Sequence, residues 1–331
     1  MQKLLTVVIP AYNTENFLEP CLYSLLQTEH RQETEIIVVD DGSTDSTGNI
    51  ADRVAQKYPE IITVIHKENG GHGSAINVGI QRAKGLYFKV LDSDDWFHVE
   101  AYDAFLETLK MITCDLIATP FFCIEAGKSK KRDIEGAEKV KWNTELVLED
   151  VAKQLHIRMH EWTIRTELLQ TYKIQLTEHS FYVDMQFILY PIPWIKTVYF
   201  LQLPVYCYRL GREGQSVSIK NMQKNQAEHQ NVLKSLVAFY QERKQAGDSE
   251  AILHYIAKGI AKMQANQMQI FLSMPMKKKT KEALVQSERW LKKECPIAYR
   301  LNEKKSIWLL RKSSYVLYPF AVLAWRVGGK K

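Results

Sequence analysis

The sequence has few cysteines and no long apolar run, and both shortages argue against common protein classes. Its five cysteines are odd in number and form no CxxC pair, which disfavours a disulfide framework or a zinc knuckle and favours a reducing compartment. The N-terminal segment MQKLLTVVIPAYN is too short for a signal peptide and has no cleavage site. No apolar stretch reaches the roughly 20 residues that cross a bilayer. We therefore expect a cytoplasmic protein.

Two common nucleotide-binding fingerprints are also missing. No GxGxxG follows the first apolar segment, which makes a Rossmann dehydrogenase a poor choice, and ENGGHGSAIN is not a GxxxxGKS phosphate loop. The three glycines of that segment would let backbone approach a ligand closely, but they fit a plain flexible turn at least as well. Taken alone, the segment is weak support for a binding site.

What the chain has in excess is basic charge at one end. The formal net charge is +6, but residues 271–331 contain 15 Lys and Arg against 4 Asp and Glu, whereas residues 1–270 contain 29 against 34. The basic character therefore lies in the last fifth of the chain, where polyanions such as anionic lipid would be met.

The first 125 or so residues alternate between apolar strands and amphipathic helices. Strands are predicted at 6–10 and in EIIVVD, ITVIHK and LYFKVLDSDDW, with helices between them over 15–28, up to about 58, and over 75–83. This alternation predicts an α/β fold with a mostly parallel sheet and helices on both faces. In such sheets ligands bind beyond the carboxyl ends of the strands, so the polar residues there are the candidates for function.

An acidic cluster, Asp92, Asp94 and Asp95, follows the fourth predicted strand. Like charges this close together need a compensating cation, and Mg²⁺ or Mn²⁺ prefers oxygen ligands and keeps substrate phosphates in its shell. The cluster is therefore interpreted as a platform for a metal and a diphosphate. The alternative is that Asp92 and Asp94 make turn and N-cap hydrogen bonds while Asp95 is merely solvated.

A second polar cluster follows the second strand, in VVDDGSTDST. Asp41 lies where it could accept a hydrogen bond from the imide N–H of a uracil, whereas Asp45, Ser46 and Thr47 suit the capping of the next helix. Both interpretations can hold together.

The order of several segments resembles a known family. VVIPAYN, IIVVDDGSTD, ENGGHGSAINVGIQRAKGLYFKVLDSDDW, YVDMQF and YCYRLGREGQSVS, in this order over residues 4–218, resemble the inverting family 2 glycosyltransferases, which have a GT-A fold. The resemblance implies metal-dependent, inverting transfer of a sugar from a UDP-sugar to a hydroxyl of a cell-surface glycan or lipid-linked acceptor, as in bacterial surface-polysaccharide assembly. It also implies Mn²⁺ or Mg²⁺ as the cofactor.

The resemblance assigns roles to individual residues. Tyr12 would stack on the base, Asp41 would read uracil, Asp94 would bind the metal and Asp184 would be the catalytic base. The nucleotide-binding residues that it implies are Pro10, Ala11, Tyr12, Asn13, Glu15, Asp41, Asn69, Ser74, Asp92 and Ser93. A loop with Arg209, Arg212, Gln215 and Ser216 would close over the diphosphate, since Arg suits bidentate phosphate contact.

The acceptor side is less well marked. His160 and Trp162 precede a segment that resembles the family's acceptor-facing motif, with Arg165 at its basic position, so both are candidate acceptor contacts. A Trp near a sugar site can stack on a pyranose, but the alternative for Trp162 is simple packing in the core.

Three departures from the family pattern leave other functions open. Val183 stands where the family usually has Glu, Ile76 stands where many members have Arg, and the segment after YR lacks the usual His. His72, Arg82 or Lys89 would have to replace the missing Arg. The alternatives are a polyprenyl-phosphate sugar transferase, in which phosphate is the nucleophile, and a non-catalytic scaffold that binds a nucleotide-sugar.

We expect three regions along the chain. Residues 1–125 form the nucleotide-sugar half of the GT-A domain, 126–218 the acceptor half with the catalytic base, and 219–331 a helical C-terminal region. Residues 220–274 predict two amphipathic helices with a turn near 247, which would pack on the catalytic domain or on another subunit of a homo-oligomer.

The last segment, SYVLYPFAVLAWRVGGKK, holds about 15 mostly apolar residues. It suits an element that lies in the membrane interface, with Tyr315, Tyr318 and Trp325 at headgroup depth and basic residues on anionic lipid. This would place the protein at the inner face of the plasma membrane. The alternative is an ordinary C-terminal helix that closes the core, and nucleic-acid binding is disfavoured because the apolar content is too high.

Overall fold

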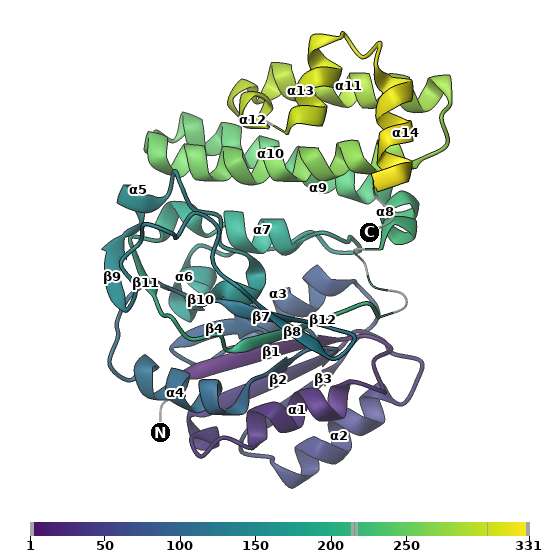
Figure 1. The fold of residues 1–331 in the computed structure, drawn as a ribbon. Helices are drawn as coiled ribbons and strands as arrows, with labels where there is room; N and C mark the ends of the chain where they lie inside the picture. Colours follow the sequence, from purple (N-terminus) through teal and green to yellow (C-terminus); the bar gives the residue numbers. More distant parts are fainter. Residues whose placement is uncertain (1–2, 213–214, 216–217, 303, 329–331) are drawn as a thin grey trace. The chain divides into compact units, whose positions relative to one another are not determined.

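The computed structural model describes residues 3–212, 215, 218–302 and 304–328. Contacts between residues divide the chain into two compact units, Met1–Arg212 (unit 1) and Glu213–Lys331 (unit 2). Among the described residues, the strands all belong to unit 1, and unit 2 is built from helices (Figure 1). The α/β part and the helical part of the sequence therefore have separate cores.

An eight-stranded sheet forms the centre of unit 1, in the order β3-β2-β1-β4-β10-β6-β11-β9. The strands from β3 to β4 in this order pair in parallel, and a helix connects each to the next along the chain. The elements are β1 (Leu5–Ala11), α1 (Leu18–Leu26), β2 (Thr34–Asp40), α2 (Thr47–Lys57), β3 (Ile62–His66), α3 (His72–Arg82) and β4 (Tyr87–Val90). The predicted α/β architecture is confirmed.

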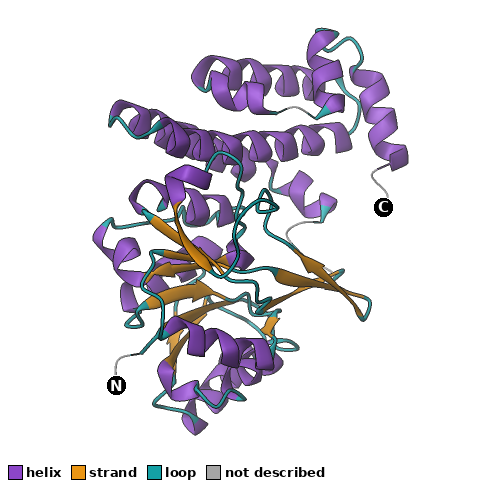
Figure 2. Cartoon of the chain, turned by 60° about the vertical axis from the view of Figure 1, so that its left-hand side comes forward, coloured by secondary structure: helices purple, strands orange, loops and turns teal. Residues whose placement is uncertain are grey.

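The remainder of this sheet is mixed, because β10 pairs antiparallel with both β4 and β6. A second sheet has the order β5-β12-β7-β8, and Figure 2 shows how loops connect the strands of the two sheets. The further strands are β5 (Trp96–Phe97), β6 (Leu116–Ala118), β7 (Phe121–Glu125), β8 (Lys128–Arg132), β9 (Thr144–Val147), β10 (Trp162–Arg165), β11 (Thr197–Phe200) and β12 (Tyr206–Leu210). The further helices of unit 1 are η1 (Arg31–Glu33), α4 (Val99–Leu109), α5 (Leu148–Val151), η2 (Met159–Glu161), α6 (Thr166–Thr171), α7 (Asp184–Leu189) and η3 (Ile192–Trp194).

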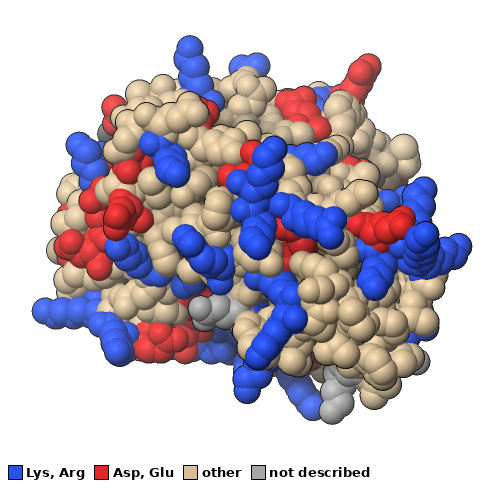
Figure 3. All heavy atoms as spheres, turned by 90° about the horizontal axis from the view of Figure 1, so that it is seen from above, with Lys and Arg blue, Asp and Glu red and all other residues tan. Residues whose placement is uncertain are grey.

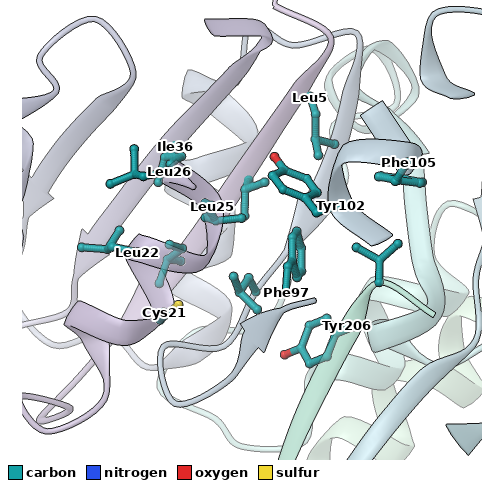
Figure 4. Close-up of a cluster of buried hydrophobic side chains, with 14 of the residues drawn as sticks. Leu5, Cys21, Leu22, Leu25, Leu26, Ile36, Phe97, Tyr102, Phe105 and Tyr206 are labelled. Carbon is teal, nitrogen blue, oxygen red and sulfur yellow. The ribbon is translucent and has the colours of Figure 1, made fainter. Parts of the chain in front are cut away.

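The core of unit 1 explains why its central strands have continuous apolar runs. β1 and β2 are buried at every position, as expected of parallel strands that are covered on both faces. Leu22 and Leu25 of α1 pack in the same cluster as Phe97 and Tyr102 (Figure 4), whose ring centroids are 5.1 Å apart. The same helix reaches the carboxyl end of β4, because Cys21 Sγ donates to the Asp92 carbonyl (3.8 Å).

Unit 2 contains the two long helices predicted for residues 220–274. α9 (Gln226–Gln245) and α10 (Glu250–Ser273) are joined at a turn in which Gly247 has a φ of +83°, a conformation that favours glycine. The Ser249 side chain caps α10 by accepting a hydrogen bond from the Ile252 N–H. The other helices are α8 (Ile219–Lys224), α11 (Lys278–Glu294), α12 (Pro296–Leu301), α13 (Lys305–Lys312) and α14 (Tyr318–Gly328).

Two predicted boundaries in unit 1 are wrong. The segment predicted as the fourth strand forms two strands. β4 ends at Val90, and a turn then leads into β5 of the other sheet. In this turn the Asp95 N–H donates to the Asp92 carbonyl (2.9 Å). The helix predicted over 75–83 begins at His72, since Gly71 with φ +84° turns the chain into it. The first difference places the acidic residues in a turn at the sheet edge, and the second places His72 in the first turn of α3.

The placement predicted for the aromatic residues of the tail is also wrong. Tyr318 is buried in the core of unit 2, and Tyr315 and Trp325 pack against that core. Tyr318, Val322 and Trp325 follow helical spacing, so they share one face of α14. That face closes the core of unit 2, as the alternative interpretation of the tail expects.

Cysteines and apolar helices give no sign of cross-linking or of a membrane span. All five cysteines are buried and free. Across residues 3–212, 215, 218–302 and 304–328, no helix combines the length and the apolar character needed to cross a bilayer.

Candidate active site

Polar residues from four parts of unit 1 meet at the carboxyl edge of the eight-stranded sheet. A hydrogen bond between Gly70 and Asp41 joins the Gly-rich turn to the end of β2. A second one, between His72 and Asp92, joins the first turn of α3 to the end of β4. This is the edge that the alternation of strands and helices predicts for ligand binding.

The turn after β1 presents Tyr12 to solvent. Asn13 has a φ of 51°, and this conformation is held because its N–H donates to the Ser43 hydroxyl (3.1 Å) and its side-chain oxygen accepts from the Thr44 N–H (2.8 Å). The Tyr12 side chain, next to this turn, is 50 % exposed. An exposed aromatic ring on a fixed turn is suited to stacking on a flat ligand.

Asp41 organises the Gly-rich turn. Its buried carboxylate accepts hydrogen bonds from the N–H groups of Gly70 (2.9 Å) and Gly71 (2.7 Å), and it pairs with the Lys67 ammonium at 2.7 Å. The Asn69 side chain donates to the Asp41 carbonyl (2.9 Å). A carboxylate has about four acceptor positions, so Asp41 keeps capacity for one further donor from a ligand.

His72 and Asp92 form a hydrogen-bonded pair at the centre of this edge, with His72 Nε2 and Asp92 Oδ1 2.9 Å apart. Burial by itself lowers the pKa of His72, but the hydrogen bond to Asp92 and the charges of Asp92, Asp184 and Asp94 outweigh it and raise that pKa. Burial acts against ionisation of Asp92, yet His72 holds the pKa of that carboxyl below its usual range. Both effects favour an imidazolium–carboxylate pair.

Two arginines of unit 1 approach Asp94. Arg212 Nε donates to Asp94 Oδ2 (2.8 Å), and Arg209 Nε donates to the Asp94 carbonyl oxygen (2.9 Å). The Phe17 ring lies 5.2 and 5.3 Å from the two guanidinium carbons. Burial and the charge of Asp92 raise the pKa of Asp94, while Arg212 opposes them. The predicted loop arginines are thus brought to the acidic turn.

Asp95 differs from its neighbours because it supports the structure of the turn. Its side chain is buried, and its two oxygens accept from the Tyr206 hydroxyl (2.6 Å) and the Arg209 N–H (2.7 Å). Burial and the charges of Asp92 and Asp94 raise the pKa of Asp95 well above its ordinary value. Asp95 therefore ties β12 to the acidic turn.

Asp184 belongs to this group of residues although it lies far from the acidic turn in the sequence. It begins α7, remains exposed to solvent, and interacts electrostatically with His72 and Asp92. Desolvation by the surrounding chain raises the pKa of its carboxyl group, with the charge of His72 opposing and that of Asp92 assisting. The structure thus brings the predicted base to the predicted metal and nucleotide residues.

Close packing of α3 holds this arrangement. A Cβ atom at Gly73 would lie 2.5 Å from the Thr177 carbonyl oxygen and 3.3 Å from the Val183 side chain. Val183 is buried, so the residue that stands in place of the family's usual Glu packs against the helix that carries His72. Only glycine at position 73 permits this approach.

His160 lies beside the acidic turn within a cluster of aromatic rings. Its ring centroid is 5.1 Å from that of Phe121 and 4.4 Å from that of Tyr208, and one of its nitrogens lies within 4.8 Å of carboxylate oxygens of Asp92 and Asp95. Burial lowers the pKa of His160 to about 4. A neutral imidazole next to carboxylates is a suitable metal ligand.

Lys89 and Trp162 lie inside unit 1. Lys89 is fully buried, and its ammonium donates to the carbonyls of His160 and Trp162, both at 3.0 Å. Burial lowers its pKa to about 7. The Trp162 side chain is completely buried, which favours the core role over acceptor contact. Of the basic residues that could replace the missing Arg at Ile76, His72 is the one that contacts a carboxylate of this site.

The remaining predicted residues of unit 1 lie in or next to these turns. Glu15 accepts a hydrogen bond from the Ser46 N–H (3.0 Å). Buried residues at this edge are Pro10, Ala11, Ser74 and Ser93. Gln215 is buried in unit 2, and Ser216 lies outside the described residues.

Sequence reasoning missed two contacts of this site. Phe17 underlies both arginines, but its only signal is an apolar position at the start of a helix. Tyr206, which holds Asp95, lies within the YCYR segment and has no pattern of its own to mark it. Both act through tertiary contacts across more than 80 residues, where local patterns carry no information.

Comparisons with known proteins bear on this arrangement. The chain matches the family described as "Glycosyl transferase family 2" over residues 6–172. It is 36 % identical over 122 residues to "Uncharacterized glycosyltransferase EpsJ" of Bacillus subtilis (37 % of this chain, 35 % of the relative). It is 41 % identical over 99 residues to "Poly(ribitol-phosphate) beta-glucosyltransferase" of Bacillus spizizenii (29 % of this chain, 16 % of the relative). The chain thus spans about a third or less of the length of these two curated relatives.

A solved structure shares the fold. The crystal structure of S. aureus TarS 1-349 in complex with UDP-GlcNAc superposes with a TM-score of 0.66 at 20 % identity, over 98 % of this chain and 92 % of that chain. The GT-A architecture expected from the resemblance is confirmed, and because the family match covers half of the sequence, the chain belongs to glycosyl transferase family 2.

Proposed function

We propose that this protein transfers a sugar from a UDP-sugar to a hydroxyl of a cell-surface glycan or lipid-linked acceptor, with inversion at the anomeric carbon. The observation that carries the proposal is the position of Asp184, which is exposed and directly follows Val183, the residue that packs against the start of the helix that carries His72. A direct displacement needs a base for the acceptor hydroxyl and positive charge for the leaving diphosphate. The site contains a base, Asp184, and carboxylates that could bind a cation to supply the positive charge.

The donor nucleotide is assigned to the turns after β1 and β2. Tyr12 offers an exposed ring for the base, and Asp41 lies buried behind the Gly-rich turn with acceptor capacity left for an imide N–H. The choice of UDP is supported by TarS, which shares the fold and was crystallised with UDP-GlcNAc. Residues 1–125 would then supply the donor half and 126–218 the acceptor half.

The acidic turn fits a divalent cation. Ligand atoms of Asp92, Asp95 and His160 lie within 4.8 Å of one another, and carboxylate oxygens with one imidazole nitrogen suit Mn²⁺, while oxygens alone suit Mg²⁺. Because both Asp95 oxygens already accept hydrogen bonds, we assign the metal to Asp92 and Asp94, with His160 beside them. When bound, the metal would stabilise the negative charge of the departing diphosphate.

The chain's own residues supply the other steps. Asp184 accepts the proton of the acceptor hydroxyl as that oxygen attacks the anomeric carbon, and a single displacement inverts this centre. Arg209 and Arg212, which already contact Asp94, are within reach of a diphosphate at the same turn and are suited to bind it. His72 holds Asp92 in the ionised form that a cation requires.

The acceptor class rests on the relatives. One of them is named for glucosylating poly(ribitol-phosphate), and we propose a polymeric acceptor of comparable kind, a surface glycan or its lipid-linked precursor. Synthesis on such acceptors would place the enzyme at the inner face of the plasma membrane.

Titration calorimetry of UDP into the full chain tests the donor site, with Mn²⁺, with Mg²⁺ and with EDTA. We expect metal-dependent binding that Asp94→Ala abolishes. Asp133→Ala, which removes an exposed carboxylate paired with Lys131, is the matched control and should bind UDP normally. Absence of UDP binding under every condition would contradict the uridine assignment. Hydrolysis of a UDP-sugar without acceptor then separates an enzyme from a scaffold, which should show none.

A further inference from the structure

An apolar surface on α13, α14 and the turn between them is unusual for a helical protein unit. Half of the large apolar side chains that are exposed in the described residues lie within residues 308–327. Phe320 is 68 % exposed and Val327 is 86 % exposed. We name this the tail surface, and it consists of Trp308, Leu309, Val316, Leu317, Phe320, Leu323 and Val327.

The tail surface is not needed to close the core of unit 2. The opposite face of α14, with Tyr318 and Val322, is buried in that core, and Trp325 packs against it. A helix on the surface of a soluble unit normally carries polar residues on its outer face. α14 carries Phe320, Leu323 and Val327 there instead, which indicates that something apolar covers this face.

Basic residues accompany the tail surface. Residues 304–331 contain seven Lys and Arg and no Asp or Glu. Lys305, Lys312 and Arg326 are exposed, and the Lys312 ammonium lies 4.6 Å from the centre of the Trp308 ring. Lys and Arg side chains are spread widely over the face of the molecule in Figure 3. A partner that is apolar within and negatively charged at its surface would complement both features.

We propose that the tail surface docks on a bilayer that contains anionic lipid, with α13 and α14 lying in the membrane interface. Phe320, Leu323 and Val327 enter the acyl boundary, while lysines contact the headgroups. The 11 residues of α14 span only about 16 Å at 1.5 Å per residue, roughly half of the hydrocarbon core. Docking is therefore peripheral.

A second copy of this chain is a poorer occupant. Pairing two tail surfaces would bring two segments without acidic residues face to face, and like charges repel across a desolvated interface. The biological purpose of docking, access to a lipid-linked acceptor, rests on the proposed function. The docking itself does not, because the residues that carry it lie in unit 2 and the donor site lies in unit 1.

Sedimentation with vesicles tests the proposal on the full chain. We expect binding to vesicles of phosphatidylcholine and phosphatidylglycerol, with a partition coefficient at least tenfold above that for phosphatidylcholine alone. Phe320→Ser/Leu323→Ser should reduce binding at least tenfold, and Lys305→Gln/Lys312→Gln should reduce it about fivefold per charge removed. The matched control is Met111→Ser/Val147→Ser, which removes two exposed apolar side chains of unit 1 and should bind as the wild type does.

Unchanged far-ultraviolet circular dichroism and thermal unfolding would show that each variant is folded. Equal binding to neutral and anionic vesicles, or equal binding by Phe320→Ser/Leu323→Ser and wild type, would overturn the proposal. So would a dimer in sedimentation equilibrium that Phe320→Ser/Leu323→Ser dissociates. UDP calorimetry on the same samples reports on the donor site, so a failure of docking and a failure of the proposed function are distinguishable.

Discussion

The two units of this chain have opposite charge and expose different chemistry. Residues 1–212 contain 22 Lys and Arg against 29 Asp and Glu, whereas residues 213–331 contain 22 against 9. In unit 1, carboxylates gather at one edge of the sheet, where a cation and a diphosphate would bind. In unit 2, basic residues accompany exposed apolar helices. The net charge of the whole chain therefore describes neither surface, and each unit suits a different partner.

The units also use buried charge differently. In unit 1, buried Asp95 accepts from the Arg209 N–H of β12, and buried Lys89 donates to the His160 carbonyl beside the acidic turn. In unit 2, buried Glu288 accepts from Arg311 (2.6 Å) and Gln264 (2.8 Å), and so ties α10, α11 and α13 together. Buried charge in the first unit shapes a site, and in the second it fixes the packing of helices.

We expect the largest effect from a substitution of Asp184 that lowers turnover but leaves UDP binding intact. Asp184→Asn removes the proposed base while keeping the size of the side chain, so turnover should fall by about 10² to 10⁴-fold, with UDP binding within twofold of wild type. Steady-state kinetics and calorimetry measure the two quantities. Glu100→Gln, which changes an exposed carboxylate of α4, is the control. Substantial residual turnover would instead favour a phosphate acceptor, which needs no strong base.

The raised pKa of Asp184 also predicts how turnover depends on pH. Because the folded protein raises the pKa of this carboxyl and a base must be deprotonated, turnover should be retained above that pKa and lost as the pH falls through it. The acidic limb of the pH–rate profile should therefore lie above the pH range of an ordinary aspartate. A flat profile across the acidic range would contradict the role of Asp184 as a base.

The regular parts of both units could be predicted from sequence because they follow local patterns. Alternating apolar segments marked β1 to β4, and helical spacing marked α9 and α10. Asp41 and Asp92 were found because strand ends in an α/β fold are ligand edges. Neither inference needs knowledge of contacts that are distant in sequence.

The parts that could not be predicted depend on such distant contacts. The Tyr206 hydroxyl that holds Asp95 comes from a strand of the second sheet, 111 residues away. Which face of α14 is buried depends on α10 and α11, so the sequence alone does not show that Tyr315, Tyr318 and Trp325 meet the core and not the membrane interface. Periodicity identifies the faces of a helix, but only packing decides which one meets the core.

One substitution should weaken unit 2 without changing the donor site. Arg311→Met leaves the fully buried Glu288 carboxylate without its ion pair, and loss of one partner of a buried pair costs about 3–5 kcal/mol. Denaturant unfolding of unit 2 should show this loss, while UDP binding in unit 1 is unchanged. The double variant Glu288→Leu/Arg311→Met should recover much of the stability, because no unpaired charge remains. A fall in UDP affinity would show that the units depend on each other.

Acid should also destabilise unit 2. His229 is buried and hydrogen-bonded to Gln267 (2.6 Å), and burial lowers its pKa to about 4. The unfolded chain has the ordinary value near 6.5, so it binds the proton first, and the free energy of unfolding should fall as the pH drops from about 6.5 to 4. The loss at pH 5 is on the order of 2 kcal/mol.

His229→Gln should show a smaller loss of stability over that pH range, measured by thermal unfolding at several pH values. His98→Gln, at an exposed histidine of unit 1, should keep the dependence of the wild type. If wild type and His229→Gln lose stability in parallel, His229 is not the group responsible.

The smallest expected effect concerns the base-stacking residue of unit 1. Tyr12→Ala removes the exposed ring beside the fixed Asn13 turn. Loss of one aromatic stacking contact with a base costs about 1–3 kcal/mol, so UDP should bind roughly 5-fold to 150-fold more weakly. Tyr12→Phe keeps the ring and should bind nearly as well as wild type. Vesicle binding through unit 2 should be the same in all three proteins. Equal UDP affinity for Tyr12→Ala and wild type would place the base elsewhere, and a parallel loss of vesicle binding would mean that the units do not act separately.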